Sequence, residues 1–165
     1  GPDQVEALLA SVGMQLPTEA QWELAARGFS RYRWYFGLAI DSDSEDASAC
    51  IHSVETTRGA LQPVGALVPN VFGLHDVIGN AAEMCRDDWS MRGTEPAIDP
   101  LHRDTRGRNP VLRGGSVWNT LDDLDVARRE PLDPSTGWPR PREYAERLPE
   151  VTGFRPIVPI SLPLR

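Results

Sequence analysis

Apolar residues near the start of the chain recur with the spacing of an amphipathic helix. Val5, Leu8, Leu9 and Val12 lie at three- and four-residue intervals, which places their side chains on one helix face. Gly13 follows directly and favours a helix end. The pattern predicts a helix over Gln4–Val12.

The segment "LPTEAQWELAARG" at Leu16–Gly28 predicts a second helix with readable ends. Thr18 can cap its start, acidic and amide side chains follow in the first turn, and Gly28 can stop it. Three small or aromatic residues would form one buried face: Trp22, Ala25 and Ala26. This pattern is typical of a structural helix.

The remaining pattern predicts short strands separated by long loops. The aromatic segment Arg31–Ile40 is expected to pack against the second helix. Glycine, proline and charged residues without periodicity predict irregular structure over Met91–Asn109 and Trp118–Val151, with one short helix at Pro141–Leu148. The expected strands are a strand, turn and short strand over Pro63–Trp89, a strand over Val111–Val117, and a core strand in "TGFRPIV" at Thr152–Val158.

Composition is typical of one globular domain. The chain has 165 residues, 40% of them apolar, which is enough for a core. We read Gly1-Pro2 as a remnant of tag removal and residues 3–165 as a single domain, either trimmed at its N-terminal side or a minimal version. A net charge of −7 disfavours a nucleic-acid partner. No apolar run is long enough for a membrane span. Because the cysteine count gives no argument for secretion either, we expect a cytoplasmic protein.

Cysteines and acidic residues suggest little chemistry by themselves. Neither Cys50 nor Cys85 lies in a C-x-x-C or Cys/His metal-ligand spacing, and two such cysteines are more typical of reduced thiols than of a disulfide or metal site. The acidic loop Asp41–Ser48 lacks the glycine and terminal glutamate of an EF-hand. A solvated loop is the simpler interpretation.

Four blocks in a fixed order carry a family resemblance: "LPTEAQWELAARG", "PNVFGLHDVIGNAAEMCRDDW" at Pro69–Trp89, "VLRGGS" at Val111–Ser116 and "TGFR" at Thr152–Arg155. They resemble the formylglycine-generating-enzyme (sulfatase-modifying factor) family. The resemblance implies an α+β fold of the C-type-lectin-like class, with two helices, short strands and long irregular loops.

The Gly79-Asn80 turn lies between two carboxylates and is a candidate metal site. A tight turn there can bring Asp76 and Glu83 to one side, with carbonyl oxygens between them, and calcium prefers such hard oxygen ligands. The resemblance implies a calcium site made by Asp76, the carbonyls of Gly79 and Ala81, and Glu83. The alternative is that Glu83 pairs with an arginine such as Arg113 while Asp76 caps the turn. A second calcium site of the family is expected to be lost, because Cys50 stands at the position of an asparagine ligand.

The resemblance also implies where copper would bind in an oxidase. The family's oxidases hold copper with two cysteines after the "RGGS" block. Asn119 stands at the position of the first, and no cysteine follows Cys85. Because soft Cu(I) needs thiolate ligands, we expect no copper and no oxidase activity. The related sulfoxide synthases need iron-binding histidines with a spacing that His52, His75 and His102 do not have.

The shorter spacing after "RGGS" is more similar to non-oxidase members, among them the variable proteins of diversity-generating retroelements, which bind ligands on this surface. The resemblance implies exposed binding positions at Trp118, Asn119, Asp122, Asp123, Asp125, Trp138 and Tyr144. Aromatic and short polar side chains suit binding. Two alternatives stay open: Trp118 belongs to the core, and the aspartates form a solvated patch.

We therefore expect a non-catalytic domain that binds a ligand or protein, as a sensor or adaptor within a larger bacterial signalling or defence protein. The alternative is an enzyme of the same superfamily with altered chemistry near Arg113, Ser116 and Asn119. A purely structural domain is the third possibility. Fold analogy alone does not decide among them.

Overall fold

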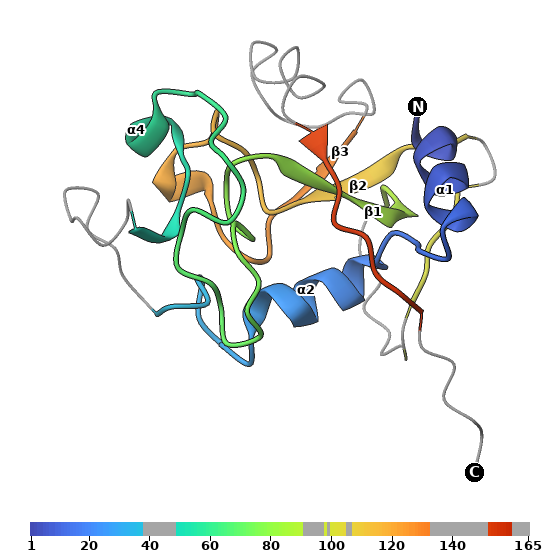
Figure 1. The fold of residues 1–165 in the computed structure, drawn as a ribbon, viewed down its shortest axis with the longest axis horizontal. Coiled ribbons are helices and arrows are strands. Elements are labelled where there is room, and N and C mark those ends of the chain that lie inside the picture. The colour runs from blue at the N-terminus through green and yellow to red at the C-terminus, as the bar shows by residue number, and fades with distance from the viewer. Residues whose placement is uncertain (38–48, 91–97, 99, 105–106, 133–151, 160–165) are drawn as a thin grey trace.

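A computed structural model describes residues 1–37, 49–90, 98, 100–104, 107–132 and 152–159 (Figure 1). Two helices and a small sheet organise this part of the chain. Its elements, in chain order, are α1 (Pro2–Ser11), α2 (Glu19–Arg27), α4 (Val54–Thr57), β1 (Ala82–Asp88), β2 (Pro110–Arg113), the 3₁₀ turn η1 (Leu121–Asp123), β3 (Arg129–Pro131) and β4 (Thr152–Gly153).

Both predicted helices are confirmed. α1 ends one residue earlier than expected, at Ser11, and Pro2 is already in its first turn. α2 begins after Thr18, whose side chain accepts a hydrogen bond from the backbone N–H of Gln21 at 3.2 Å. It ends at Gly28, which adopts a left-handed conformation with φ of 54°. Local capping chemistry therefore fixes the bounds of α2.

The strands form one four-stranded sheet in the order β3-β2-β1-β4. β1 pairs antiparallel with β2, placing Glu83 opposite Arg113, and parallel with β4 on its other side. β2 pairs antiparallel with β3. β1 is thus a central strand, and the polar side chains of the two family blocks meet on it.

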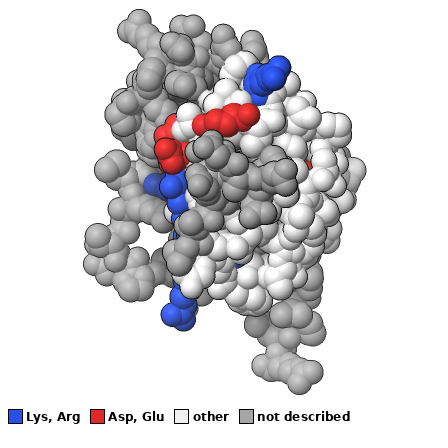
Figure 2. Space-filling model, turned by 90° about the vertical axis from the view of Figure 1, so that its left-hand side faces the viewer, with Lys and Arg blue, Asp and Glu red and all other residues white. Residues whose placement is uncertain are grey.

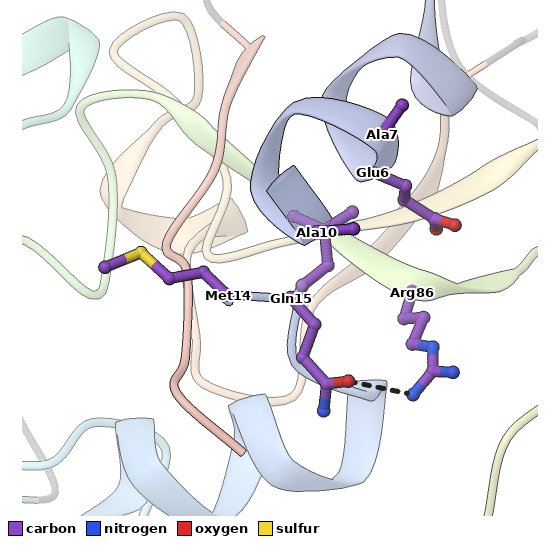
Figure 3. Close-up of a pocket in the computed structure, with 7 residues that line it drawn as sticks. Glu6, Ala7, Ala10, Met14, Gln15 and Arg86 are labelled. Carbon is purple, nitrogen blue, oxygen red and sulfur yellow. Dashed lines mark hydrogen bonds between the residues drawn. The ribbon is translucent and has the colours of Figure 1, made fainter. Parts of the chain in front are cut away.

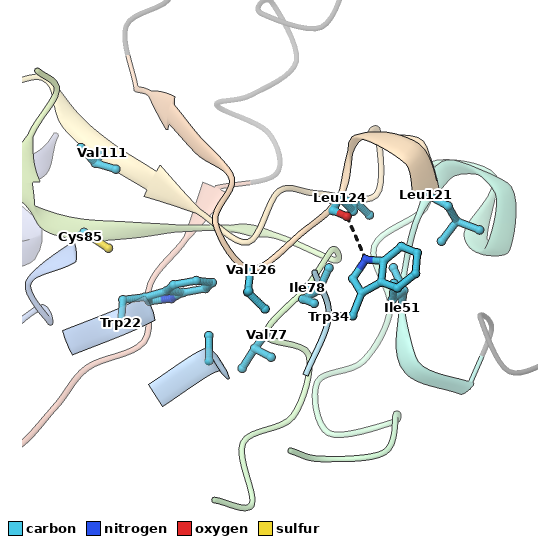
Figure 4. Close-up of a cluster of buried hydrophobic side chains, with 11 residues drawn as sticks. Trp22, Trp34, Ile51, Val77, Ile78, Cys85, Val111, Leu121, Leu124 and Val126 are labelled. Carbon is cyan, nitrogen blue, oxygen red and sulfur yellow. Dashed lines mark hydrogen bonds between the residues drawn. The ribbon is translucent and has the colours of Figure 1, made fainter. Parts of the chain in front are cut away.

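Two hydrophobic clusters pack against the sheet. Met84 and Cys85 are neighbours on β1 but belong to different clusters, because successive side chains of a strand point to opposite faces. The larger cluster lies on the α2 side and includes Trp22 and Trp34 (Figure 4). Trp34 lies in the aromatic segment that was expected to pack against this helix, so that prediction is confirmed. The smaller cluster joins Leu9 of α1 to the other face.

Two strand predictions need correction, and one strand was missed. No strand forms over residues 63–81, because positive φ angles at Gly65, Gly73, Asp76, Gly79 and Asn80 repeatedly turn the backbone out of the extended conformation. The strand expected over Val111–Val117 ends at Arg113, since Gly114 and Gly115 also have positive φ. A strand that periodicity missed, β3, follows in a segment expected to be irregular.

The closing segment is also less regular than predicted. β4 covers only Thr152–Gly153, and Phe154 is 42% exposed rather than in the core. Ile157 instead makes an isolated antiparallel bridge with Gln15.

Cys50 and Cys85 are both free thiols, as expected. The acidic loop Asp41–Ser48 and the helix predicted at Pro141–Leu148 lie outside the described residues.

Candidate functional site

Arg113, the arginine of "RGGS", is fully buried and joins β2 to α2. Its guanidinium donates to Glu19 at 3.1 Å and to Glu23 at 2.5 Å, and lies over the Trp22 ring at 5.1 Å. It also donates to the backbone carbonyls of residues 126 and 127 at 2.9 and 3.0 Å. Burial lowers the pKa of Arg113, and the two carboxylates oppose that shift. This arginine is therefore a structural crosslink among α2, β2 and the loop before β3.

The tight turn after β2 is closed by Asn119. Its side-chain oxygen accepts a hydrogen bond from the backbone N–H of Ser116 at 2.8 Å, and it is only 3% exposed. The Ser116 hydroxyl accepts from the backbone N–H of Trp118 at 3.3 Å. A side chain at Gly115 would collide with Leu124. The expectation that Asn119 is exposed is therefore wrong, because its side chain holds the turn from inside.

The loop that follows is held by hydrogen bonds from Arg33 and exposes two aspartates. Leu121 and Leu124 are buried, whereas Asp122 and Asp123 are exposed. Arg33 donates to backbone carbonyls of this loop, at 3.2 Å to both Leu121 and Leu124 and also to Asp122. The aspartates are therefore displayed on a backbone that is fixed by hydrogen bonds.

Other predicted binding positions are placed differently. Asp125 is half-buried and accepts a hydrogen bond from the backbone N–H of Ala127 at 2.6 Å. Trp118 is half-buried with its ring against Gly59, so it lies between the two alternatives of core and surface. Trp138 and Tyr144 lie outside the described residues.

Glu55 of α4 accepts hydrogen bonds from the backbone N–H of Leu121 at 3.2 and 3.3 Å. η1 and α4 are therefore neighbours on one side of the molecule. Figure 2 shows this side, where acidic side chains gather close to arginines among mostly neutral atoms.

Three of the four candidate metal residues, Asp76, Ala81 and Glu83, line one surface pocket of about 460 Å³. Gly79 is not part of that lining, and its backbone forms an isolated parallel bridge with His52. Within the described residues, no three His, Cys, Asp or Glu side chains are grouped as metal ligands.

Glu83 does pair with an arginine, but with Arg155 of "TGFR" and not with Arg113. The Arg155 guanidinium contacts both carboxylate oxygens, at 2.6 and 3.0 Å, and the indole N–H of Trp22 donates to Glu83 at 2.7 Å. Sequence reasoning missed this pair. The only available signal was a charged residue in an otherwise apolar closing segment.

Asp76 is buried, and only one of its two carboxylate oxygens accepts a hydrogen bond within the described residues. One carboxylate oxygen accepts from the backbone N–H of Gly65 at 2.6 Å. The other, Oδ1, has no hydrogen-bond partner among the described residues and lies 3.8 Å from Nε2 of His52, which also has none. Burial lowers the pKa of His52, and Asp76 opposes that shift. A buried carboxylate oxygen without a donor is a suitable cation ligand, so the residues fit calcium.

The arrangement of the described residues defines a C-type-lectin-like α+β domain of the formylglycine-generating-enzyme type. Residues 4–140 match the sulfatase-modifying factor enzyme 1-like domain. The chain therefore belongs to that family.

Similar proteins include serine/threonine-protein kinases and formylglycine-generating enzymes. The chain is 36% identical over 128 residues to serine/threonine-protein kinase pkn1 of Chlamydia caviae, covering 74% of this chain and 19% of the kinase. It is 39% identical over 117 residues to the formylglycine-generating enzyme of Thermomonospora curvata, covering 63% of this chain and 38% of the enzyme. The chain thus spans well under half the length of these relatives.

Solved structures agree with this fold. Variable protein 1 of Treponema denticola superposes with a TM-score of 0.58 at 28% identity, over 72% of this chain and 41% of that protein. PvdO of Pseudomonas aeruginosa superposes with a TM-score of 0.68 at 20% identity, over 79% of this chain and 53% of that protein.

Among the described residues, no helix is both long and apolar enough to cross a membrane.

Proposed function

We propose that this domain is a non-catalytic binding module whose contact surface is the loop after the "RGGS" turn, centred on Asp122 and Asp123. Its ligand would be a protein, and its role that of a sensor or adaptor within a larger protein. The observation that carries the proposal is the position of Asn119. The family resemblance assigns a copper-binding cysteine to that position, and here an amide closes a turn inside the protein.

The backbone of this loop supports binding rather than flexible display. Arg33 donates to carbonyls on both sides of η1, so ordering the exposed aspartates costs little conformational entropy when a partner binds. The likeness to a variable protein and to kinases that carry a related segment gives further support.

The enzyme alternative receives less support. Arg113, Ser116 and Asn119, its expected centre, are all buried and engaged in hydrogen bonds that hold the turn and α2. A substrate could reach them only after this packing opened.

A peptide display library tests the proposal. Clones enriched on the wild-type domain should lose binding to the double variant Asp122→Asn/Asp123→Asn and keep binding to Asp3→Asn, a charge change at an exposed site on α1. Equal binding to all three proteins would contradict the proposed surface.

We also propose that calcium binds in the pocket beside β1, held by Asp76, the carbonyls of Gly79 and Ala81, and Glu83. The support is the half-satisfied carboxylate of Asp76. Calcium would neutralise this charge and tie the turn to β1. Glu83 would share its carboxylate between the ion and Arg155.

Thermal unfolding tests this second proposal. A cation that binds only the folded state raises the melting temperature, by the equivalent of about 2.7 kcal/mol at a concentration one hundred times the dissociation constant. We expect such a rise with calcium in the wild type, its reversal by a chelator, and its loss in Asp76→Ala. Magnesium is the matched control, because it demands a tighter octahedral site. An unchanged melting temperature with calcium would exclude the site.

A further inference from the structure

A second pocket lies between α1 and β1, away from the loop surface and from the calcium candidate. It has a volume of about 360 Å³, at the small end of ligand pockets, which run from about 300 to 1,000 Å³. Ala7, Ala10 and Leu16 give it an apolar lining, and Gln15 and Arg86 add polar groups (Figure 3).

Most N–H groups of the Arg86 guanidinium have no acceptor among the described residues. Its only side-chain hydrogen bond among the described residues is a long one, 3.5 Å, to the side-chain oxygen of Gln15. No carboxylate in the described part of the chain pairs with it. Most other described arginines do pair with carboxylates: Arg27, Arg103, Arg108, Arg113, Arg128, Arg129 and Arg155. Arg31, Arg33 and Arg58 likewise have no carboxylate partner in the described part of the chain, and Arg86 differs from them in lining this pocket.

The one carboxylate in the pocket wall is already committed elsewhere. Glu6 contacts both Arg103 and Arg108 at 3.0 Å. Burial raises the pKa of Glu6, but the hydrogen bonds from the two arginines outweigh it and lower that pKa below its ordinary value. The charge of Glu6 is thus balanced by those arginines and does not satisfy Arg86.

The rim of the pocket is fixed in place. Gln15 exchanges two backbone hydrogen bonds with Ile157, at 2.9 and 2.8 Å. The Gln15 side-chain N–H groups have no acceptor in the described part of the chain, so they add donors next to Arg86. Arg86 follows Met84 by two positions on β1, and the backbone N–H of Arg86 donates to Pro17 at 2.9 Å. The N–H donors of Arg86 and Gln15 that lack acceptors are held in fixed positions beside apolar side chains. Such a site suits an anion that carries a small apolar group.

We propose that this pocket binds a monocarboxylate that carries a short branched or straight apolar group, with its carboxylate on Arg86 and Gln15 and its apolar part against Ala7, Ala10 and Leu16. Such chemistry is offered by a free short-chain acid and by the C-terminal residue of a peptide. This site is independent of the proposed loop surface.

Amide NMR spectra of the ¹⁵N-labelled chain test the site with three probes. We expect 4-methylpentanoate and N-acetyl-leucine to shift the backbone amides of residues 7, 10 and 86 in a saturable manner. The neutral 4-methylpentanamide, of the same shape, should leave them unshifted. A response to N-acetyl-leucine alone assigns the peptide C-terminus as the source, and a response to 4-methylpentanoate alone assigns a free acid. A response to both supports the shared chemistry of a carboxylate with an apolar group.

Variants separate the roles of charge and space. Arg86→Gln removes the positive charge and should weaken binding of the acids about tenfold or more, the loss expected for one charge-assisted hydrogen bond. Ala10→Leu fills the pocket from an exposed helix position and should also weaken binding, while Arg86 stays in place. Arg31→Gln, the same change at an exposed arginine outside the pocket, should bind as the wild type does. The spectra themselves report whether each variant is folded.

Three outcomes would overturn the proposal. The first is the absence of any saturable shift with either acid. The second is binding by Arg86→Gln that equals that of the wild type. The third is equal binding of the amide, which would show that the pocket does not select the charge.

Discussion

Arg113 and Asp76 are both buried charged residues in family blocks, and their surroundings differ. Arg113 has two carboxylates, two carbonyls and an aromatic face around its guanidinium. Asp76 has one backbone donor and leaves one oxygen without a partner in the described part of the chain. Burying a charge is costly unless it is compensated. The first environment compensates the charge of Arg113 through these partners and leaves only its Nε without a hydrogen bond among the described residues. The second suits an additional cation.

The largest expected effect is at Arg113. Arg113→Met should lower the free energy of unfolding by about 3 kcal/mol or more, because Glu19 and Glu23 lose their shared buried partner. Denaturant unfolding measures the change. Arg31→Met, at an exposed arginine, should change the stability by less than about 0.5 kcal/mol. A loss below about 1 kcal/mol in Arg113→Met would remove the contrast between the two regions.

The second effect probes how rigid the Asp76 turn is. A Cβ at Gly79 would lie 2.1 Å from the backbone oxygen of His52, and φ is 81°. Gly79→Ala should therefore cost more than the 1–2 kcal/mol or so of left-handed strain alone. Gly13→Ala is the matched control, since φ is 73° there and no atom lies within 4 Å. Equal melting temperatures for the two variants would mean that the turn relaxes freely.

A smaller effect, of opposite sign, is expected at Asp76 itself. Without calcium, Asp76→Asn keeps an acceptor for Gly65, removes an uncompensated charge and suits a φ of 55°. The unfolding free energy should stay the same or rise by up to about 1 kcal/mol. With calcium, the wild type should become the more stable protein. A marked loss of stability in calcium-free Asp76→Asn would show that the aspartate charge is already compensated.

The smallest effect is a pH dependence at another well-paired charge. The pKa of Glu6 is lowered from 4.5 in the folded state, so the unfolded state binds more protons below that pH. The stabilisation is therefore present above pH 4.5 and is lost as the pH falls through the folded-state pKa. Glu6→Gln should flatten this acidic part of a stability curve measured by urea unfolding. An unchanged slope would mean that the ion pairs with Arg103 and Arg108 do not form in solution.

The local parts of the fold could be predicted because their causes are local. Thr18 and Gly28 bound α2 through capping and a left-handed C-cap. The loops were harder, since strands of two to four residues have too little periodicity to be recognised. The expected strand before β1 failed for a related reason. Asp76 and Asn80 adopt positive φ, which non-glycine residues rarely do without tertiary support.

In the candidate sites too, the sequence predicted the local features and missed those that depend on distant segments. Sequence placed Asp76 and Glu83 near each other, and the pocket lining agrees with that placement. It did not find that Arg155 is the partner of Glu83, because 72 residues separate them and only the parallel pairing of β4 with β1 brings them together. The exposure of Asp122 beside buried Leu121 and Leu124 could be read from alternating residue types, whereas the burial of Asn119 could not.

By itself, the sequence determined the family, the two helices and the absence of cysteines after Cys85, because motifs, caps and composition are properties of neighbouring residues. The tertiary structure decided which charges are compensated. Arg113 is enclosed by carboxylates of α2, Asp76 keeps an oxygen without a donor among the described residues, and Arg86 lines a pocket without a carboxylate partner in the described part of the chain. Compensation depends on distances between segments far apart in the chain, and folding alone sets those distances.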